Sequence, residues 1–173
     1  MWGRMITFVA NLRMYLLYRL GMRFLGNIEA KTDAKGRVFL PSVFRKELQV
    51  AGEECLVMRK DVHQRCLMLY PESVWNSRMD MMFSNADEWD ELERQAIRQY
   101  MSDVEILTLD GNGRLLVPRR YLDAADITST VRFIGMNDTI ELWNPANVEG
   151  PQLPQELFAE KLKQIMGRSK QPT

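Results

Sequence analysis

Two arginines stand at matching places in two stretches of the chain, TDAKGRVFLP and TLDGNGRLLVP. In each stretch an aspartate is followed by two residues, Gly-Arg, three apolar residues and a proline, and the offset between the stretches is 77 residues throughout. The matched pairs are Asp33 with Asp110, Gly36 with Gly113, Arg37 with Arg114, and Pro41 with Pro118. A rigidly held guanidinium can donate paired hydrogen bonds to guanine or to a phosphate. Both arginines are therefore candidates for contact with DNA.

The residues around each arginine predict how it is positioned. Glycine can adopt a positive φ, and aspartate can accept bonds from backbone N–H groups two residues on, so both Asp-x-x-Gly-Arg segments are predicted as chain reversals. Each arginine then leaves its reversal at the start of a strand, and each proline starts a short helix. An alternative remains open, in which Asp33 and Arg37 form an ion pair that only stabilises the reversal. Exposed pairs of this kind contribute about 0–1 kcal/mol.

The surroundings of the two arginines differ in charge. Lys31 and Lys35 lie on or beside the first reversal. Thr108 and Asn112 take the corresponding places in the second. We therefore predict that the first reversal contributes more to binding. The candidate DNA-binding residues are Lys31, Lys35, Arg37, Asn112 and Arg114. A structural role is predicted for the other matched residues, because carboxylates repel phosphates and the rest shape the backbone; these are Asp33, Gly36, Pro41, Asp110, Gly113 and Pro118.

The repetition extends beyond the reversals and predicts two equivalent units. Each unit reads as strand, reversal, strand, proline-started helix and hairpin, and each hairpin ends in an aromatic residue followed closely by proline. The fold class is therefore α+β, mainly β, built from two tandem repeats with packed helices. The expected segments are repeat 1 at 22–72, linking helices at 73–101, repeat 2 at 102–148, and a C-terminal helix and tail at 149–173.

The linking segment is expected to form two helices that break near Ser84-Asn85. In the second helix, apolar residues recur at three- and four-residue spacing and predict a single apolar stripe: Trp89, Leu92, Ala96, Ile97 and Tyr100. We expect this stripe's tryptophan, together with Trp75 and Trp143, to lie in the core or in an interface.

Composition limits the other functions. The 173 residues carry 23 basic and 23 acidic side chains, so a strongly basic nucleic-acid-binding surface is excluded but a local basic patch is not. The single histidine, His63, and two separated cysteines, Cys55 and Cys66, argue against a metal site, a disulfide framework or a nucleophile–histidine pair. We therefore expect no metal, no cofactor, no small-molecule substrate and no enzymatic activity.

The first 21 residues differ from the remainder. They are apolar, aromatic and basic, but Arg13 and Arg19 interrupt the apolar run, so neither a signal peptide nor a membrane-spanning helix is predicted. We expect the native domain to start at Met22 and residues 1–21 to lie outside it.

Residues 22–166 resemble the MraZ family of bacterial transcriptional regulators, which consist of two tandem AbrB-like (SpoVT-AbrB-type) domains. The resemblance rests on DAKGRVFLP and DGNGRLLVP, on CLMLYPESVW after the first unit, and on IGMNDTIELWNP after the second. It implies a double-split, swapped-hairpin β-barrel made of two interleaved halves. The family's Asp-x-x-x-Arg motif falls on Asp33 with Arg37, and on Asp110 with Arg114.

The resemblance also implies a function. It points to a cytoplasmic, nucleoid-associated repressor that forms a ring-shaped homo-oligomer and binds short direct repeats in double-stranded promoter DNA. The promoter would be its own, at the head of a division and cell-wall gene cluster. Many weak contacts in register would compensate for a small basic patch. Two alternatives are an antitoxin-like or sporulation-type AbrB regulator, which the duplicated unit disfavours, and a structural ring that does not bind DNA.

Overall fold

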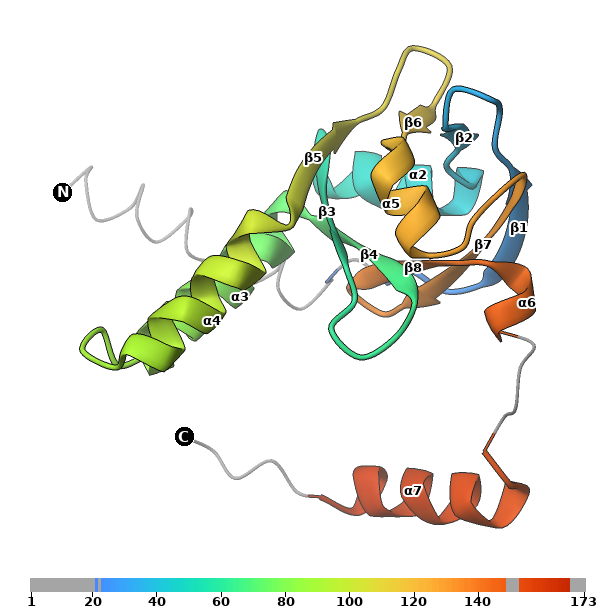
Figure 1. Cartoon of the computed structure of the whole chain (residues 1–173). Coiled ribbons are helices and arrows are strands. Elements are labelled where there is room, and N and C mark those ends of the chain that lie inside the picture. The colour runs from blue at the N-terminus through green and yellow to red at the C-terminus, as the bar shows by residue number, and fades with distance from the viewer. Residues whose placement is uncertain (1–20, 22, 149–152, 169–173) are drawn as a thin grey trace, which may run out of the picture.

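The two halves of the chain contribute the same run of elements, and their strands interleave (Figure 1). The computed structural model describes residues 21, 23–148 and 153–168. The expected extension at 1–21 therefore lies outside the described residues, except for residue 21. The first half forms β1 (Asn27–Lys31), β2 (Arg37–Phe39), α2 (Ser42–Ala51), β3 (Cys55–Lys60) and β4 (Cys66–Pro71). The second half repeats this order with β5 (Val104–Thr108), β6 (Arg114–Leu116), α5 (Arg119–Ala124), β7 (Thr130–Met136) and β8 (Thr139–Trp143).

Strand pairing joins each half to the other. A six-stranded antiparallel sheet has the order β1-β7-β8-β4-β3-β5, and β2 pairs with β6 in a separate two-stranded ladder. Thus β1 of the first half pairs with the hairpin strand β7 of the second, from Asn27 opposite Ile134 to Lys31 opposite Thr130. In return, β5 of the second half pairs with β3 of the first. The predicted α+β class with tandem repeats is confirmed, and the exchange of strands accounts for the barrel's two interleaved halves.

The core fills the space between the six-stranded sheet, the β2–β6 ladder and the two short helices. Phe44 of α2 lies edge-to-face with Phe24, at 5.7 Å between ring centroids, and with Phe133 of β7, at 6.5 Å. Tyr121 and Leu122 are the buried residues of α5. Full burial of one such side chain is favourable by about 1.5–3 kcal/mol. The core therefore holds each short helix against the ladder that it follows.

The proline-started helices have the predicted beginnings. Pro41 and Pro118 occupy the N-cap positions of α2 and α5, with φ of −51° and −60°. A proline at a helix start loses no hydrogen bond, since the first N–H groups of a helix have no partner within it. Each helix therefore begins directly after its proline, three residues beyond the last residue of the strand that carries the arginine.

A helical hairpin made of α3 (Glu72–Asn85) and α4 (Glu91–Ser102) projects from the barrel (Figure 1). At its base Trp75 stacks on Tyr100, with centroids 5.8 Å apart and planes at 7°, and Arg59 lies over the same tyrosine ring. At its tip Trp89 is 87% exposed and lies before α4 rather than in it. The predicted stripe is thus at most half-buried, at Ile97 and Tyr100, because the hairpin extends beyond anything that could cover its tip. Trp89 therefore does not lie in the core, and the other expected place for it, an interface, stays a prediction.

The last two helices are α6 (Pro145–Val148) and α7 (Gln155–Gly167), and the exposed apolar residues of α7 include Leu157, Phe158, Leu162 and Ile165. Trp143 is half-buried against the smaller cluster around Trp75.

Cys55 and Cys66 are free thiols at opposite ends of the β3–β4 hairpin. Within the described residues, no three metal-ligating side chains gather in one place. None of the described helices has both the length and the apolar character needed to cross a membrane.

Candidate nucleic-acid interface

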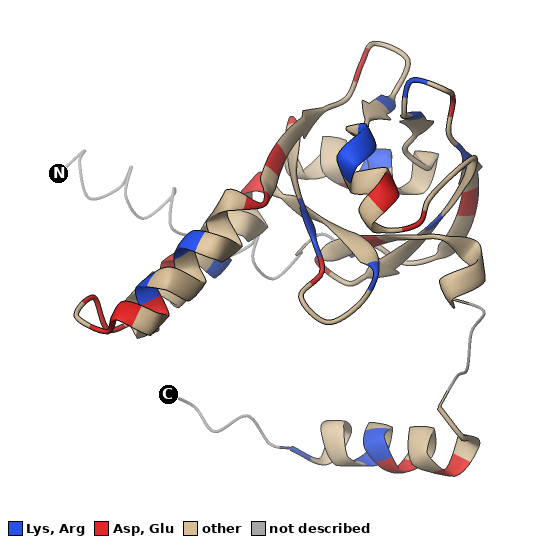
Figure 2. Cartoon of the chain, in the orientation of Figure 1, with Lys and Arg blue, Asp and Glu red and all other residues tan. Residues whose placement is uncertain are grey.

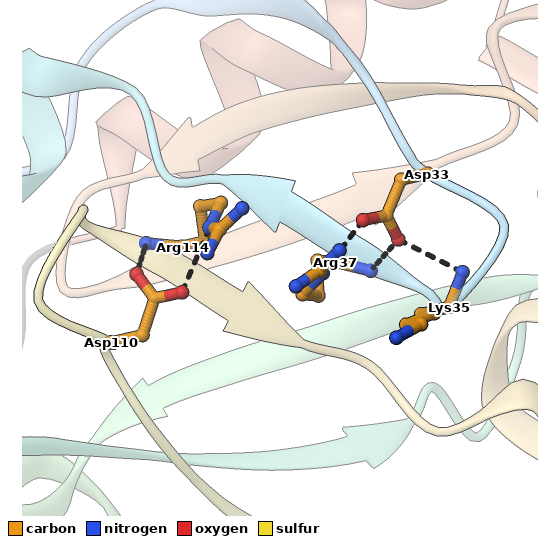
Figure 3. Close-up of polar contacts among 5 residues, drawn as sticks. All are labelled: Asp33, Lys35, Arg37, Asp110 and Arg114. Carbon is orange, nitrogen blue, oxygen red and sulfur yellow. Dashed lines mark hydrogen bonds and ion pairs between the residues drawn. The ribbon is translucent and has the colours of Figure 1, made fainter.

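The first reversal is organised around one aspartate. Oδ1 of Asp33 accepts hydrogen bonds from the backbone N–H groups of Lys35 and Arg37, both at 2.9 Å. Oδ2 of Asp33 accepts from Nε of Arg37 at 2.6 Å (Figure 3). The backbone closes the same turn, because Asp33 N–H donates to the Arg37 carbonyl at 3.0 Å. One carboxylate therefore shapes the reversal and also fixes the direction of the arginine side chain.

The second reversal repeats this geometry residue by residue. Oδ1 of Asp110 accepts from the N–H groups of Asn112 and Arg114 at 2.9 and 3.0 Å, and Oδ2 accepts from Nε of Arg114 at 2.8 Å. The Asp110 N–H donates to the Arg114 carbonyl at 2.9 Å. An ion pair between the aspartate and the arginine is thus present in both turns. It uses only Nε, and the terminal nitrogens of Arg37 and Arg114 have no hydrogen-bond partner among the described residues.

Glycine is required in both reversals for conformation and for space. Gly36 has φ of 82° and Gly113 has φ of 80°, values that L-residues with a side chain rarely adopt. A Cβ at Gly36 would collide with the carbonyl oxygen of Val117. A Cβ at Gly113 would collide with the guanidinium of Arg45, which reaches over the second turn from α2.

The β2–β6 ladder places the two arginines on one face. Val38 is opposite Leu115, and both are buried, so their neighbours point outward. Arg37 lies opposite Leu116, and Arg114 lies opposite Phe39, with its Cζ 5.8 Å from the ring centroid. Two hydrogen bonds extend the ladder symmetrically, from Leu40 N–H to the Gly113 carbonyl at 3.1 Å and from Val117 N–H to the Gly36 carbonyl at 2.9 Å. The outward face of the ladder consists of Arg37, Phe39, Arg114 and Leu116.

The aspartates of the two turns remain ionised at neutral pH. Backbone hydrogen bonding from Arg37 is the main cause that lowers the pKa of Asp33, and Arg114 acts in the same way on the pKa of Asp110. Since the folded chain lowers both pKa values, the associated stabilisation is complete above the ordinary aspartate pKa. It is lost as the pH falls through the lowered value. Each arginine thus keeps a charged partner throughout the neutral range.

The other predicted binding residues surround this face. Lys35 and Asn112 lie exposed in the two turns, and Lys31 lies exposed at the end of β1. Both turns project from the same end of the barrel (Figure 1), and lysine and arginine lie there on the first turn, on the ladder and on α5 (Figure 2). The structure therefore brings all five predicted residues to one end.

Two residues of this face were not predicted. Phe39 and Leu116 are 54% and 56% exposed and lie on the same outward face of the ladder as the two arginines. Strand alternation would have placed them beside the arginines, because each lies two residues after one. Apolar contacts of this kind suit the methyl group of thymine.

Comparison with known proteins decides the family. The family described as "MraZ protein, putative antitoxin-like" matches residues 23–98 and 101–164. The chain belongs to the MraZ family of transcriptional regulators. The match covers both halves of the barrel and thereby confirms the resemblance seen in the two repeated stretches.

Individual relatives within the MraZ family agree with this assignment. A protein named transcriptional regulator MraZ from Phocaeicola vulgatus is 56% identical over 146 residues, which cover 84% of this chain and 95% of that protein. The protein of the same name from Bacteroides thetaiotaomicron is 50% identical, covering 84% and 93% of the two chains. A more distant one from Anaeromyxobacter is 32% identical, covering 84% and 99%.

Proposed function

We propose that this MraZ-family chain is a sequence-specific DNA-binding regulator that reads duplex DNA with the outward face of the β2–β6 ladder and its two turns. The observation that carries the proposal is the matched presentation of Arg37 and Arg114. Each is held at Nε by its own aspartate, with its terminal nitrogens unpartnered among the described residues. Terminal nitrogens presented in this way match O6 and N7 of guanine in the major groove.

The lysines of the first turn supply the sequence-independent part of binding. Lys31 and Lys35 are exposed and lie beside Arg37, where they can neutralise phosphates. The second turn has Thr108 and Asn112 instead, so the two halves of the barrel share a shape but differ in charge. Binding that includes phosphate contacts weakens linearly with the logarithm of the salt concentration.

A patch of this size favours multivalent binding. One barrel presents few cations, and several copies on neighbouring DNA repeats can increase the overall affinity by orders of magnitude. The tip of the α3–α4 hairpin supports self-association, since Phe83, Trp89 and Leu92 are exposed there. We therefore propose a ring-shaped homo-oligomer that binds short direct repeats upstream of its own gene. There, at the nucleoid, it would repress the division and cell-wall cluster that follows.

The test is a direct binding measurement with the full chain. A labelled duplex containing the DNA immediately upstream of the gene is titrated and followed by fluorescence anisotropy, from about 50 to about 200 mM salt. A duplex of the same length and composition, with its repeats shuffled, serves as the control. We expect tighter binding to the native duplex at every salt concentration. If the chain self-associates but binds neither duplex, the proposal is overturned in favour of a structural ring.

A further inference from the structure

The repeat symmetry is broken at one position that faces a turn. Leu122 of α5 packs against Gly36 of the first turn, with its Cδ1 3.3 Å from the place of an added Cβ. The equivalent residue of α2, 77 positions earlier, is Arg45, and it packs against Gly113 of the second turn. Each helix thus covers the turn of the other repeat, one with an apolar side chain and the other with a guanidinium.

The position of Arg45 follows from the chain path. Leu40 donates its N–H to the Gly113 carbonyl, and α2 begins two residues later. Side chains on a helix point back toward its N-terminus, so a residue in the first turn of α2 lies over that junction. An added Cβ at Gly113 would lie 2.9 Å from both Cδ and Cζ of Arg45. The guanidinium therefore rests on the backbone next to Arg114.

Packing alone does not account for an arginine here. Nε of Arg45 is fully buried and has no hydrogen-bond partner, which costs free energy, whereas the apolar Leu122 fills the equivalent place and is almost fully buried. The two terminal nitrogens of Arg45 have no partner among the described residues, and neither belongs to the fully buried atoms without a partner. They are therefore open to solvent and to a ligand that approaches the second turn.

We propose that Arg45 of the first repeat contacts a DNA phosphate beside the second turn. This inference rests on the proposed DNA-binding function. It deepens that function by assigning to the second turn a cation that comes from the other half of the barrel. The second turn lacks counterparts of Lys31 and Lys35, and Arg45 compensates for them in part. The exchange of elements between the repeats thus gives each turn at least one cation besides its own motif arginine.

The test compares three substitutions at this position in the full chain. Arg45→Leu installs the residue that the second repeat uses, Arg45→Met keeps the length without the charge, and Arg45→Lys keeps the charge. Lys46→Met removes an exposed charge from the same helix and serves as the matched control. Binding to the labelled upstream duplex is measured against salt, and thermal unfolding and sedimentation confirm that each variant folds and assembles.

We expect Arg45→Leu and Arg45→Met to weaken binding and to reduce the slope of log affinity against log salt by about 0.9 per engaged barrel. Arg45→Lys retains most of the slope, and Lys46→Met retains the affinity. Unchanged affinity and slope in Arg45→Leu would overturn the inference. Weaker binding with an unchanged slope in all three variants would also overturn it, because it indicates a purely structural role. If the wild-type chain binds no duplex, the proposed DNA-binding function itself is overturned. That outcome differs from the two above, in which the wild-type chain binds DNA and only the role of Arg45 is overturned.

Discussion

Val38 and Leu115 are paired with each other across the β2–β6 ladder, and each is the other's counterpart in the two repeats. The local two-fold axis of the barrel therefore passes between them. Arg37 and Arg114 are consequently related by this axis and emerge on the same outward face. Two copies of one turn thereby become a single surface.

Removing the aspartate of the first turn should weaken DNA binding, although it removes a negative charge. In Asp33→Ala the backbone N–H groups of Lys35 and Arg37 lose their acceptor, and Nε of Arg37 loses its anchor. The side chain of Arg37 is then no longer held in one direction, and we expect this to lower the DNA affinity more than the loss of the negative charge raises it. The control is Asp123→Ala, which breaks a similar arginine pair on α5. Anisotropy titrations should show weaker binding for Asp33→Ala only, and tighter binding for it would contradict the assigned role.

Substituting the glycine of the first turn should destabilise the fold. Gly36→Ala places a Cβ against the Val117 carbonyl in a left-handed conformation, and we expect a loss of about 2 kcal/mol or more in the free energy of unfolding. Gly111→Ala is the matched control, since that position has open space and no left-handed φ. Its change should stay within about 0.5 kcal/mol. Urea denaturation measures the free energy of unfolding of both variants. If the two values are equal, Gly36 is not required for the conformation of the turn.

The thiols should react slowly in the folded protein. Burial, reinforced by Glu72, raises the pKa of Cys55 to about 11, and burial raises the pKa of Cys66 to about 12. Because the thiolate is the reactive form, alkylation at pH 8 should be slower than for a free cysteine by orders of magnitude. The rate should rise with pH toward these values, with Cys66 slower than Cys55. Mass spectrometry after iodoacetamide treatment measures both sites, and urea should abolish the difference.

The tip of the α3–α4 hairpin should control self-association. Trp89→Ala removes the most exposed apolar side chain among the described residues, and a tryptophan at the centre of an interface contributes about 2 kcal/mol or more. Val50→Ala removes another exposed apolar residue, on α2, as a control. Sedimentation velocity should show smaller assemblies for Trp89→Ala alone. An unchanged distribution would exclude this tip as the contact between subunits.

The predictable part of this structure was the part that local chemistry determines. Gly36 and Pro41 indicated a reversal and a helix start, because a positive φ and a missing N–H restrict what the backbone can do there. The pairing of β1 with β7 was implied only by the resemblance to a family, since strands far apart in sequence pair through tertiary contacts. Periodicity placed Trp89 in the second linking helix, whereas it lies before α4 and is exposed, because periodicity reports an apolar stripe but not whether the same chain covers it.

The motif of the candidate site and the polar residues beside it were predicted, but its apolar residues and Arg45 were not. Arg37 and Arg114 were identified through the repeated stretches, and alternation along the strand would also have identified Phe39. Arg45 had no signal, since an arginine on a short helix usually lies on its solvated face. Its place over Gly113 depends on the exchange of helices between the two repeats. Its distance from Arg114 in sequence hides their proximity in the fold.

The most direct test of the account is the binding of Arg37→Ala to the upstream duplex. Arg65→Ala is the matched control, because Arg65 also pairs with an aspartate but lies in the β3–β4 loop, at the opposite end of the barrel from the turns (Figure 1). With folding and assembly unchanged, Arg37→Ala should weaken binding to the native duplex by about 1–3 kcal/mol per engaged site and reduce its preference over the shuffled duplex. Arg65→Ala should bind like the wild type. An Arg37→Ala protein that folds, assembles and binds the native duplex as tightly as the wild type would contradict the central claim.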